Sequence, residues 1–296
     1  MNYTIKNEYL TLTVSSTGAE KQTLVSSKGI NYLRQPDKYW NRVAPFLFPN
    51  VGRLKGNSTF INGSEYHLPQ HGFLRDQEFE VLHQVDDEIA LVNIYNEKSL
   101  SKYPFKYKVI VHYQLEKNKL VTKISITNED EKSMPFNIGG HPGFYCPLYP
   151  NEQFNDYKIV FSKSETFNAP SVESDGTLNF QVSSGEFIHL KELPLDYKYF
   201  EVDAIVIPRV KSKEVKLINK NNKGIKFSYH DFITLAIWTR PNAGFVCLEP
   251  WIGYADRHDS NKQFIEKDNI IVLDPLEEKV VSYDNRIRRK YNDYNK

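Results

Sequence analysis

Side chains that can move protons occur at five places where glycine, proline or aromatic residues frame them. Glu249 is the most informative, because four apolar residues lead directly to it and a proline and a tryptophan follow. A carboxylate at the end of a buried strand is costly unless it is paired or used in chemistry. Two histidines, two carboxylates and an arginine together fit a general acid–base site for a polar, neutral substrate. The five stretches are Phe48–Leu54 around Arg53, Leu68–Arg75 around His71, Asn137–Phe144 around His141, Phe200–Val206 around Asp203 and Phe245–Trp251 around Glu249.

His141 has the most unusual neighbours of the five, because two glycines precede it and a proline and a third glycine follow it. No regular element tolerates that density of glycine and proline. We therefore expect the backbone to bend sharply on both sides of His141 and to point its imidazole in a fixed direction. A tight turn with an incidental histidine is the alternative if His141 stands alone.

Taken singly, the other side chains have ordinary explanations. Arg53 fits a structural ion pair, and Asp203 fits the cap of a turn. His71 by itself fits a satisfied core histidine. Cys247 fits a plain core residue of an apolar strand better than it fits a nucleophile.

Several other kinds of chemistry find little support. His67 and His71 have the spacing of a helical zinc site, but Pro69 lies between them and no glutamate follows His67. The sequence has no Cys-X-X-Cys motif, no glycine-rich phosphate loop and no Gly-X-Ser-X-Gly elbow. We therefore expect no metal and no cofactor.

The composition fits a globular protein of 296 residues with a net charge of +1, which gives no electrostatic case for nucleic acid or an anionic membrane. Aromatic residues make up 14% of the chain, which suits strands and also the apolar faces of sugars. With two cysteines, no signal peptide and no stretch long enough to span a bilayer, we expect a cytoplasmic, reduced protein.

The elements that must position these side chains are strands. Apolar residues alternate with polar ones in many short runs joined by polar turns, which predicts an all-β antiparallel sandwich or barrel. We expect one domain over residues 1–288 and a polar tail over 289–296, with the arginine-rich end frayed from residue 285 onwards. Short helical pieces are expected at 36–42, 97–103 and 260–266. The predicted strands include 10–14, a hairpin of 107–115 and 120–126, and 215–218, 225–229, 233–239, 244–248 and 279–283.

Five short motifs, taken in order, resemble the aldose 1-epimerase, or galactose mutarotase, family, and most of all its LacX-like branch. The resemblance runs from about residue 3 to about residue 288. It implies a β-supersandwich of large antiparallel sheets with the sugar bound in an open cleft. The motifs are Gly-Arg at 52–53, His-Gly-Phe at 71–73, Gly-His-Pro-Gly-Phe at 140–144, Val-Asp-Ala at 202–204 and Cys-Leu-Glu-Pro-Trp at 247–251.

The resemblance also implies roles in a mutarotase, an isomerase that interconverts the α and β anomers of a hexose. Glu249 matches the general base at the C1 hydroxyl, and His141 matches the general acid at the ring oxygen. His71, Arg53 and Asp203 match residues that hold the sugar. One base and one acid on opposite sides of the C1–O5 unit suffice, without a cofactor, metal or covalent intermediate. Glu249 must start ionised and His141 protonated, so we expect a negative field near the imidazole.

Two departures leave the sugar open. Val51-Gly52 precedes the arginine where well-characterised galactose mutarotases have Ala-Asn, and Phe73 stands where they have glycine. The stretch around Arg75 instead resembles the His-Gly-Phe-Ala-Arg of hexose-6-phosphate epimerases, in which arginines bind the phosphate. Arg53 and Arg75 could do so here, since a guanidinium suits phosphate; a surface charge at a strand edge is the alternative for Arg75. We expect a free hexose or a hexose phosphate as the partner of a monomer or homodimer.

Two other classes of function remain. A non-catalytic carbohydrate sensor would keep the aromatic residues and Arg53 but would not need the pair of Glu249 and His141. A glycoside hydrolase or lyase would use two carboxylates around one bond, here Asp203 and Glu249. The paired histidines fit that chemistry less well.

Overall fold

The largest element of the fold is a nine-stranded antiparallel sheet. The computed structural model describes residues 1–288, and each hydrogen-bonded strand pair in them is antiparallel. In spatial order the nine strands are β15 (Leu178–Pro194), β14 (Tyr157–Val172), β17 (Glu214–Asn219), β18 (Gly224–Ser228), β22 (Glu278–Arg288), β10 (Lys119–Asn128), β9 (Tyr107–Glu116), β8 (Glu88–Ile94) and β7 (Glu80–Gln84).

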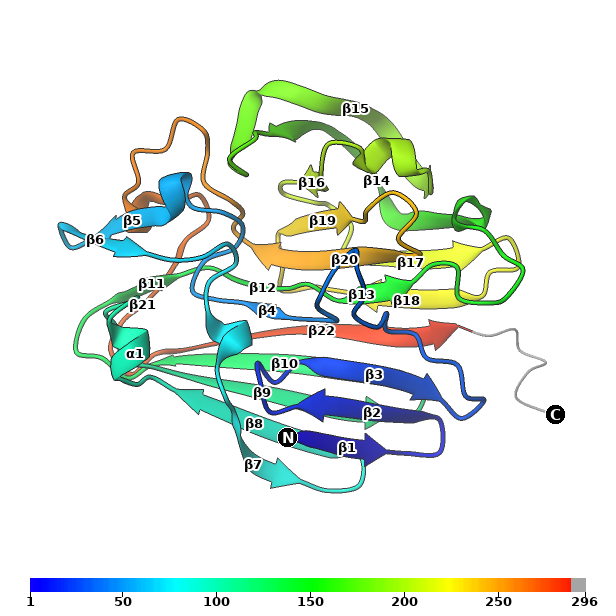
Figure 1. Cartoon of the computed structure of the whole chain (residues 1–296), viewed down its shortest axis with the longest axis horizontal. Helices are drawn as coiled ribbons and strands as arrows, with labels where there is room; N and C mark the ends of the chain where they lie inside the picture. The colour runs from blue at the N-terminus through cyan, green and yellow to red at the C-terminus, as the bar shows by residue number, and fades with distance from the viewer. Residues whose placement is uncertain (289–296) are drawn as a thin grey trace.

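Two smaller sheets lie over this one, as Figure 1 shows: the three-stranded sheet covers β8–β10, and the sheet that contains β20 lies beside β17 and β18. The strands of the latter are β16 (Ile205–Ile207), β19 (Thr234–Trp238), β20 (Phe245–Ile252), β12 (Ile138–Gly140) and β4 (Phe46–Leu47), with β13 (Gly143–Tyr145) also paired to β20. The three-stranded sheet contains β1 (Asn2–Lys6), β2 (Leu10–Ser15) and β3 (Lys21–Ser26).

The remaining elements are small. Two further ladders are two-stranded, β5 (Ser58–Ile61) with β6 (Ser64–His67) and β11 (Met134–Phe136) with β21 (Ile271–Leu273). Among the described residues α1 (Glu97–Leu100) is the only α-helix, and it has no more than one turn. The 3-10 turns are η1 (Lys55–Asn57), η2 (Leu74–Asp76), η3 (Phe154–Asp156), η4 (Tyr197–Phe200) and η5 (Phe264–Glu266). No helix in residues 1–288 is long and apolar enough to cross a bilayer.

The core lies where the smaller sheets face the nine-stranded sheet. Along β9 every second side chain is buried, as the predicted hairpin requires. The Phe46 ring on β4 packs 6.4 Å from Tyr113 on β9, and Phe144 on β13 packs 6.0 Å from Phe227 on β18. These ring contacts fix the sheet that contains β20 against the nine-stranded one. The site described below therefore rests on a packed foundation.

The predicted all-β class is confirmed, as are the hairpin and the other strands named above. The two longest strands, β14 and β15, were not predicted. Their ladder contains several register shifts, and much of β15 is exposed, so apolar residues do not alternate cleanly along it.

Two predictions of local structure, at 36–42 and at 285–288, are wrong. Residues 36–42 form no helix, because this segment wraps around the guanidinium of Arg34, which donates to the carbonyls of Trp40 and Arg42. The short helical pieces expected at 97–103 and 260–266 are present as one turn each, α1 and η5. Residues 285–288 are not frayed, because β22 pairs with β10 as far as Arg286 and with β18 as far as Arg288. The predicted tail at 289–296 lies outside the described residues.

Candidate active site

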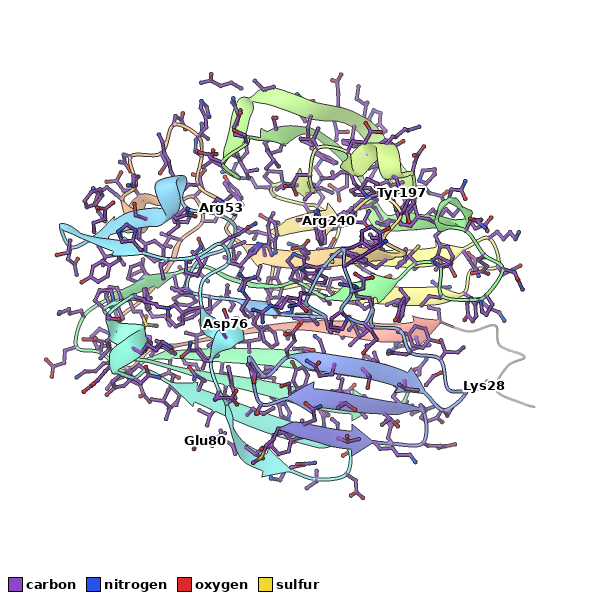
Figure 2. All side chains as sticks on the ribbon, in the orientation of Figure 1. Lys28, Arg53, Asp76, Glu80, Tyr197 and Arg240 are labelled. Atoms are coloured by element: carbon purple, nitrogen blue, oxygen red, sulfur yellow. The ribbon has the colours of Figure 1, made fainter. Side chains whose placement is uncertain are left out.

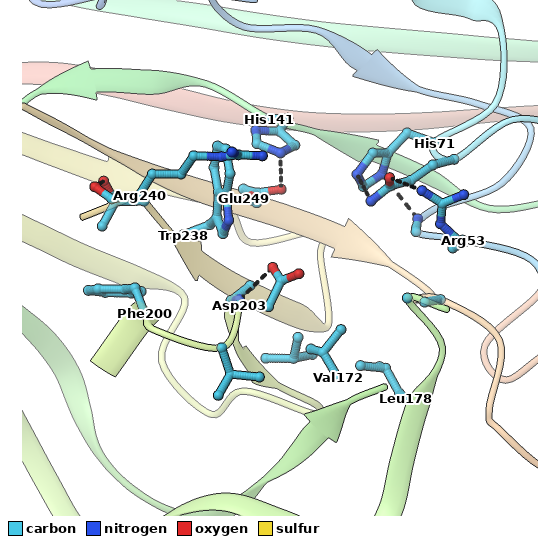
Figure 3. A pocket seen from close by; sticks show the side chains of 18 of the residues that line it. Arg53, His71, His141, Val172, Leu178, Phe200, Asp203, Trp238, Arg240 and Glu249 are labelled. Carbon is cyan, nitrogen blue, oxygen red and sulfur yellow. Dashed lines mark hydrogen bonds and ion pairs between the residues drawn. The ribbon is translucent and has the colours of Figure 1, made fainter. Parts of the chain in front are cut away.

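A cavity of about 540 Å³ opens beside β19 and β20 and collects the predicted site residues. Figure 3 shows Arg53 and His71 at one end, Arg240 and Phe200 at the other, and Glu249 between them. In Figure 2 the labelled Arg53 and Arg240 lie in the half of the molecule that carries β19 and β20, away from the three-stranded sheet. All six side chains singled out from the sequence line this one cavity: Arg53, His71, Arg75, His141, Asp203 and Glu249.

Strand β20 supplies the floor. Successive strand residues point to opposite faces, so Cys247, Glu249 and Trp251 share one face. On the neighbouring strand Trp238 pairs with Cys247 and Ala236 pairs with Glu249. The carboxylate therefore lies on a rigid central strand rather than on a loop, which fixes its position.

The central contact of the cavity joins the predicted base to the predicted acid. Oε2 of Glu249 lies 3.0 Å from Nε2 of His141, and both side chains are almost fully buried. Oε2 accepts no hydrogen bond of good geometry from the described residues, and Nδ1 of His141 has no partner there either. The pair is thus close enough to exchange a proton and keeps unused hydrogen-bonding capacity.

Burial drives both members of this pair towards their neutral forms. Desolvation raises the pKa of Glu249 well above its ordinary value, and the nearby Asp203 charge raises it further. Desolvation, helped by the nearby Arg75 charge, lowers the pKa of His141 to about 3. Glu249 is the acidic group in contact with the imidazole, and the Asp203 carboxylate lies across the same cavity. The ligand-free pair is best described as a carboxylic acid beside a neutral imidazole.

The two glycines before His141 have a different structural role from the predicted one. Gly139 and Gly140 belong to β12 and have no positive φ, so the backbone does not turn sharply there. A Cβ on Gly139 would come 2.6 Å from the Trp251 ring, and one on Gly140 would come 3.1 Å from the Tyr283 ring. The two glycines are needed for close approach of these rings to the strand that ends before His141.

His71 is held in one tautomer. Its Nδ1 accepts a hydrogen bond of 3.1 Å from the Gly52 amide, while its own amide donates to the Gly52 carbonyl over 2.8 Å. A neutral imidazole with Nδ1 as acceptor carries its proton on Nε2. Burial and the charge of His141 lower the pKa of His71 well below its ordinary value, so it stays neutral. His71 can therefore donate one hydrogen bond from Nε2, which lies 3.5 Å from the side-chain nitrogen of Gln70.

The turn that carries His71 depends on glycine. Gly72 has a φ of +68°, and a Cβ there would lie 2.0 Å from the Phe48 carbonyl oxygen. No other residue fits both the conformation and the space. His71 itself has a φ of +67°, which is unusual for a residue with a side chain.

Two tryptophans flank His141. The Trp40 ring stacks on His141 at 4.7 Å, and the Trp238 ring meets it edge-on at 5.7 Å. Trp40 lies on the irregular 36–42 segment that the buried Arg34 holds in place. Aromatic rings near the reacting groups give the apolar face of a sugar ring something to pack against.

Gln70 links the two arginines that were predicted to meet the substrate. Arg53 donates to its side-chain oxygen over 3.1 Å and also to Asn57. Arg75 donates to its carbonyl over 2.8 Å, and the Nε of Arg75 is buried without a hydrogen-bond partner. Burial lowers the pKa of Arg75 slightly, chiefly through desolvation. Both guanidinium groups therefore belong to one wall, beside His71.

Asp203 lies across the cavity from Glu249 (Figure 3). Its Oδ1 accepts a 2.7 Å hydrogen bond from the Ala204 amide, and its side chain remains exposed through the cavity mouth. Desolvation by the surrounding protein raises the pKa of Asp203. The hydrogen bond from the Ala204 amide and the positive charge of Arg240 lower it. A carboxylate in this position can accept hydrogen bonds from hydroxyl groups.

Sequence reasoning missed several lining residues. Trp238 could have been found, because alternation along 233–239 and pairing with β20 put it on the face of Glu249. Nothing in the sequence marks Trp40, Gln70 or Arg240, which reach the cavity from irregular segments. Arg240 lies over the Trp238 ring at 5.9 Å.

One group of side chains within residues 1–288 has the make-up of a metal site. His141, Cys247 and Glu249 each offer a donor atom, and these atoms lie within 4.8 Å of one another. Both cysteines are free and buried.

Comparison with known proteins places the chain among sugar epimerases. The family model for aldose 1-epimerase matches residues 1–276. The plasmid-encoded LacX protein of Lactococcus lactis subsp. lactis is 34% identical over 295 residues, and the match covers 96% of this chain and 98% of that one. The chromosomal LacX protein of the same organism matches with the same identity and coverage.

Solved structures give the same result. A galactose mutarotase related enzyme from Lactobacillus acidophilus is 30% identical, has a TM-score of 0.90, and is matched over 98% of both chains. A galactose mutarotase-like protein from Lactobacillus casei is 26% identical with a TM-score of 0.87, over 97% of this chain and 100% of that one.

Proposed function

The chain belongs to the aldose 1-epimerase family, and we propose that it interconverts the α and β anomers of a hexose by acid–base opening and closing of the ring. Glu249 is the base at the C1 hydroxyl, and His141 is the acid at the ring oxygen O5. The observation that carries the proposal is the 3.0 Å contact between the two groups in a cavity lined by Trp40 and Trp238.

Two protons take part in the reaction. One is carried by the pair of Glu249 and His141, and the other is on the C1 hydroxyl of the sugar. At the start Glu249 is a carboxylate and His141 an imidazolium. Ring opening moves the C1 hydroxyl proton to Glu249 and the imidazolium proton to O5, while the C1–O5 bond breaks and C1=O forms. Rotation about C1–C2 and the reverse proton transfers then close the ring on the other face.

Burial favours the protonation state that Glu249 and His141 reach in the middle of the reaction, after the ring has opened. After ring opening the pair is a neutral acid beside a neutral imidazole, which is the state that desolvation favours for both groups. The ionised starting pair is correspondingly disfavoured. Proton transfer to and from the sugar during ring opening thus runs in the direction that burial favours, whereas forming the ionised pair from the neutral resting pair is a cost that contacts with the bound sugar must offset.

The short distance between base and acid also suits the substrate. O1 and O5 are both bonded to C1, so the two groups that act on them must lie close together. The contact between Glu249 and His141 satisfies this from one wall of the cavity rather than from opposite sides of the sugar. Nε2 of His71, the guanidinium of Arg53 and the carboxylate of Asp203 are then available for the other hydroxyl groups.

The direct test is the rate at which freshly dissolved α-glucose or α-galactose reaches its equilibrium rotation, measured by polarimetry above the spontaneous rate. We expect catalysis at substoichiometric enzyme. Sugar binding without acceleration would point to a carbohydrate sensor. Release of reducing sugar from a disaccharide would point to a hydrolase that uses Asp203 and Glu249.

The pH profile is expected to lack a histidine limb near pH 6.5. The pair with one proton gains a second only when His141 protonates, and burial puts that pKa at about 3. It loses its proton only well above the ordinary glutamate range. We therefore expect kcat/KM, measured between about pH 4 and pH 8, to stay level through pH 6.5. An acid limb centred near pH 6.5 in folded protein would contradict this.

A phosphorylated hexose is a second candidate substrate, supported by the wall around Gln70. Arg53 and Arg75 both bind Gln70, and the buried Nε of Arg75 makes no hydrogen bond, the Asp76 carboxylate lying 3.9 Å from it. A phosphate between them would receive charge-assisted hydrogen bonds. This arrangement would put C6 of the sugar towards His71 rather than towards Arg240.

Arg75→Gln tests that candidate, with Arg240→Gln as the matched control at the other end of the cavity. If phosphate binds at Arg75, its loss should lower kcat/KM for galactose 6-phosphate by about 10- to 100-fold, since a hydrogen bond to a charged group is worth about 1.5–3 kcal/mol. The value for galactose should change far less. Exchange NMR gives both rates. Equal losses for the two sugars would remove the phosphate hypothesis, and a selective loss in Arg240→Gln would move the phosphate to the other end.

A further inference from the structure

Beside the acid and the base, and fully buried, lies a third group that anomer exchange does not use, the thiol of Cys247. Cys247 and Glu249 are two residues apart on β20, so their side chains leave the same face. His141 reaches this face because Gly143, two residues later, pairs with Cys247. Donor atoms of the three side chains consequently lie within 4.8 Å of one another.

A second observation marks the same spot as able to take a ligand. Oε2 of Glu249 is buried, with its side chain 2% exposed, and its 3.0 Å contact with Nε2 of His141 lacks good hydrogen-bond geometry and is its only polar contact with the described residues. Nδ1 of His141 is likewise buried and unpartnered. Cys247 is fully buried and forms no disulfide. Buried polar atoms without partners are rare in folded proteins, and ions are one of the things that satisfy them.

We propose that His141, Cys247 and Glu249 form a binding site for a zinc ion, which occupies the acid and the base and so blocks the epimerase. One nitrogen, one thiolate and one carboxylate oxygen are all ordinary zinc ligands, and three protein ligands leave a fourth position open to the cavity. Bond lengths of 2.0–2.3 Å in a tetrahedron put neighbouring donors about 3.3–3.8 Å apart. The 3.0 Å contact between Glu249 and His141 must therefore lengthen slightly, while donors as far apart as the 4.8 Å limit must approach by about an ångström.

The charge of the complex suits a dry site. Zinc with one thiolate, one carboxylate and a neutral imidazole has no net charge, so burying it avoids the cost of an isolated ion. The imidazole is already neutral in the free protein. The carboxylic acid and the thiol must each release a proton to bind, so zinc should bind more tightly as the pH rises. The thiolate also favours zinc over magnesium or calcium, which prefer oxygen ligands.

The binding test needs no enzyme activity. Untagged protein competes with a chromogenic chelator for Zn²⁺, and Co²⁺ serves as a spectroscopic substitute, because cobalt bound to a thiolate gives a charge-transfer absorption in the near ultraviolet. Cys247→Ser is the variant. Cys146→Ser is its matched control, because Cys146 is the other free, buried cysteine and is not part of the group. Circular dichroism and thermal melting show whether each variant is folded, and Cys247→Ala provides a second substitution.

We expect one zinc ion per chain in the wild type and in Cys146→Ser. In both Cys247 variants the dissociation constant should rise at least tenfold, and the thiolate–cobalt band should disappear. Equal zinc binding by Cys247→Ser and wild type would overturn the proposal. So would a wild type that binds no zinc at micromolar concentrations, or one that gives no thiolate–cobalt band.

The second part of the proposal, that zinc inhibits the enzyme, rests on the proposed epimerase function. Zinc should slow wild-type anomer exchange, a chelator should restore it, and the ratio of rates with and without zinc should approach one in Cys247→Ser. Using the ratio cancels any effect of the substitution on the basal rate. If zinc binds as expected but the protein accelerates no anomer exchange, then the proposed function fails and the zinc site stands. If zinc binds and exchange continues unaffected, the inhibitory role is wrong.

Discussion

Glu249→Gln is expected to reduce the rate of mutarotation to a small fraction of the wild-type rate while leaving the fold intact. A positioned group that transfers a proton typically contributes about 10²–10⁴-fold to the rate, and an amide cannot take the C1 hydroxyl proton. The loss should appear in kcat, because the carboxylate acts in the transition state more than in binding. Polarimetry with fresh α-galactose or α-glucose, or exchange NMR at equilibrium, measures it.

The structure indicates that Glu249→Gln should remove the base with little effect on stability. Burial already favours the neutral form of Glu249 in the ligand-free protein, and glutamine has the shape of that neutral acid. We therefore expect the free energy of unfolding to change by no more than about 1 kcal/mol, because no unpaired charge is created or removed. Thermal melting is the control. A stable Glu249→Gln protein with wild-type rates would end the assignment of Glu249 as the base.

Local sequence signals were enough to find the chemical groups. Glu249 stood out because a charged residue followed four apolar ones, and the structure shows why: it lies on the central strand β20 of a packed sheet. All six predicted side chains line one cavity, although they come from positions up to 196 residues apart, between Arg53 and Glu249. The order of the motifs, not any one of them, carried that information.

What the sequence could not provide is the arrangement between segments. Trp40 stacks on His141 only because Arg34 holds an irregular segment in place, and no periodic pattern encodes that. The glycines before His141 were attributed to a bend, whereas they make room for Trp251 and Tyr283, which arrive from distant strands. The neutral state of the acid–base pair is likewise a consequence of burial, which needs the whole fold to be known.

The same distinction applies to the strands. The hairpin of β9 and β10 was predicted because one face is buried along its whole length. Strands β14 and β15 were missed because register shifts and exposure interrupt their pattern. Residues 285–288 lacked a recognisable period, yet β10 pairs with them as far as Arg286 and β18 as far as Arg288. Pairing with neighbours, rather than the local sequence, decides such segments.

His141→Asn is expected to be as damaging as the loss of the base, with a fall in kcat of about 10²–10⁴-fold. Asparagine cannot carry the proton that O5 needs, and it gives up the stacking contact with Trp40. Some loss of stability is therefore expected, and melting curves show whether the variant is folded at the assay temperature. Wild-type turnover by folded His141→Asn would remove it as the acid.

The double variant Glu249→Gln with His141→Asn distinguishes a coupled pair from two independent helpers. If each group acted alone, the two losses would multiply. In the single ring-opening step His141 gives a proton to O5 while Glu249 takes one from the C1 hydroxyl. The two groups lie only 3.0 Å apart, so removing either one disables both. We therefore expect the double variant to be little slower than either single one, as for residues that act as a unit. Multiplicative losses would mean that Glu249 and His141 act in separate steps.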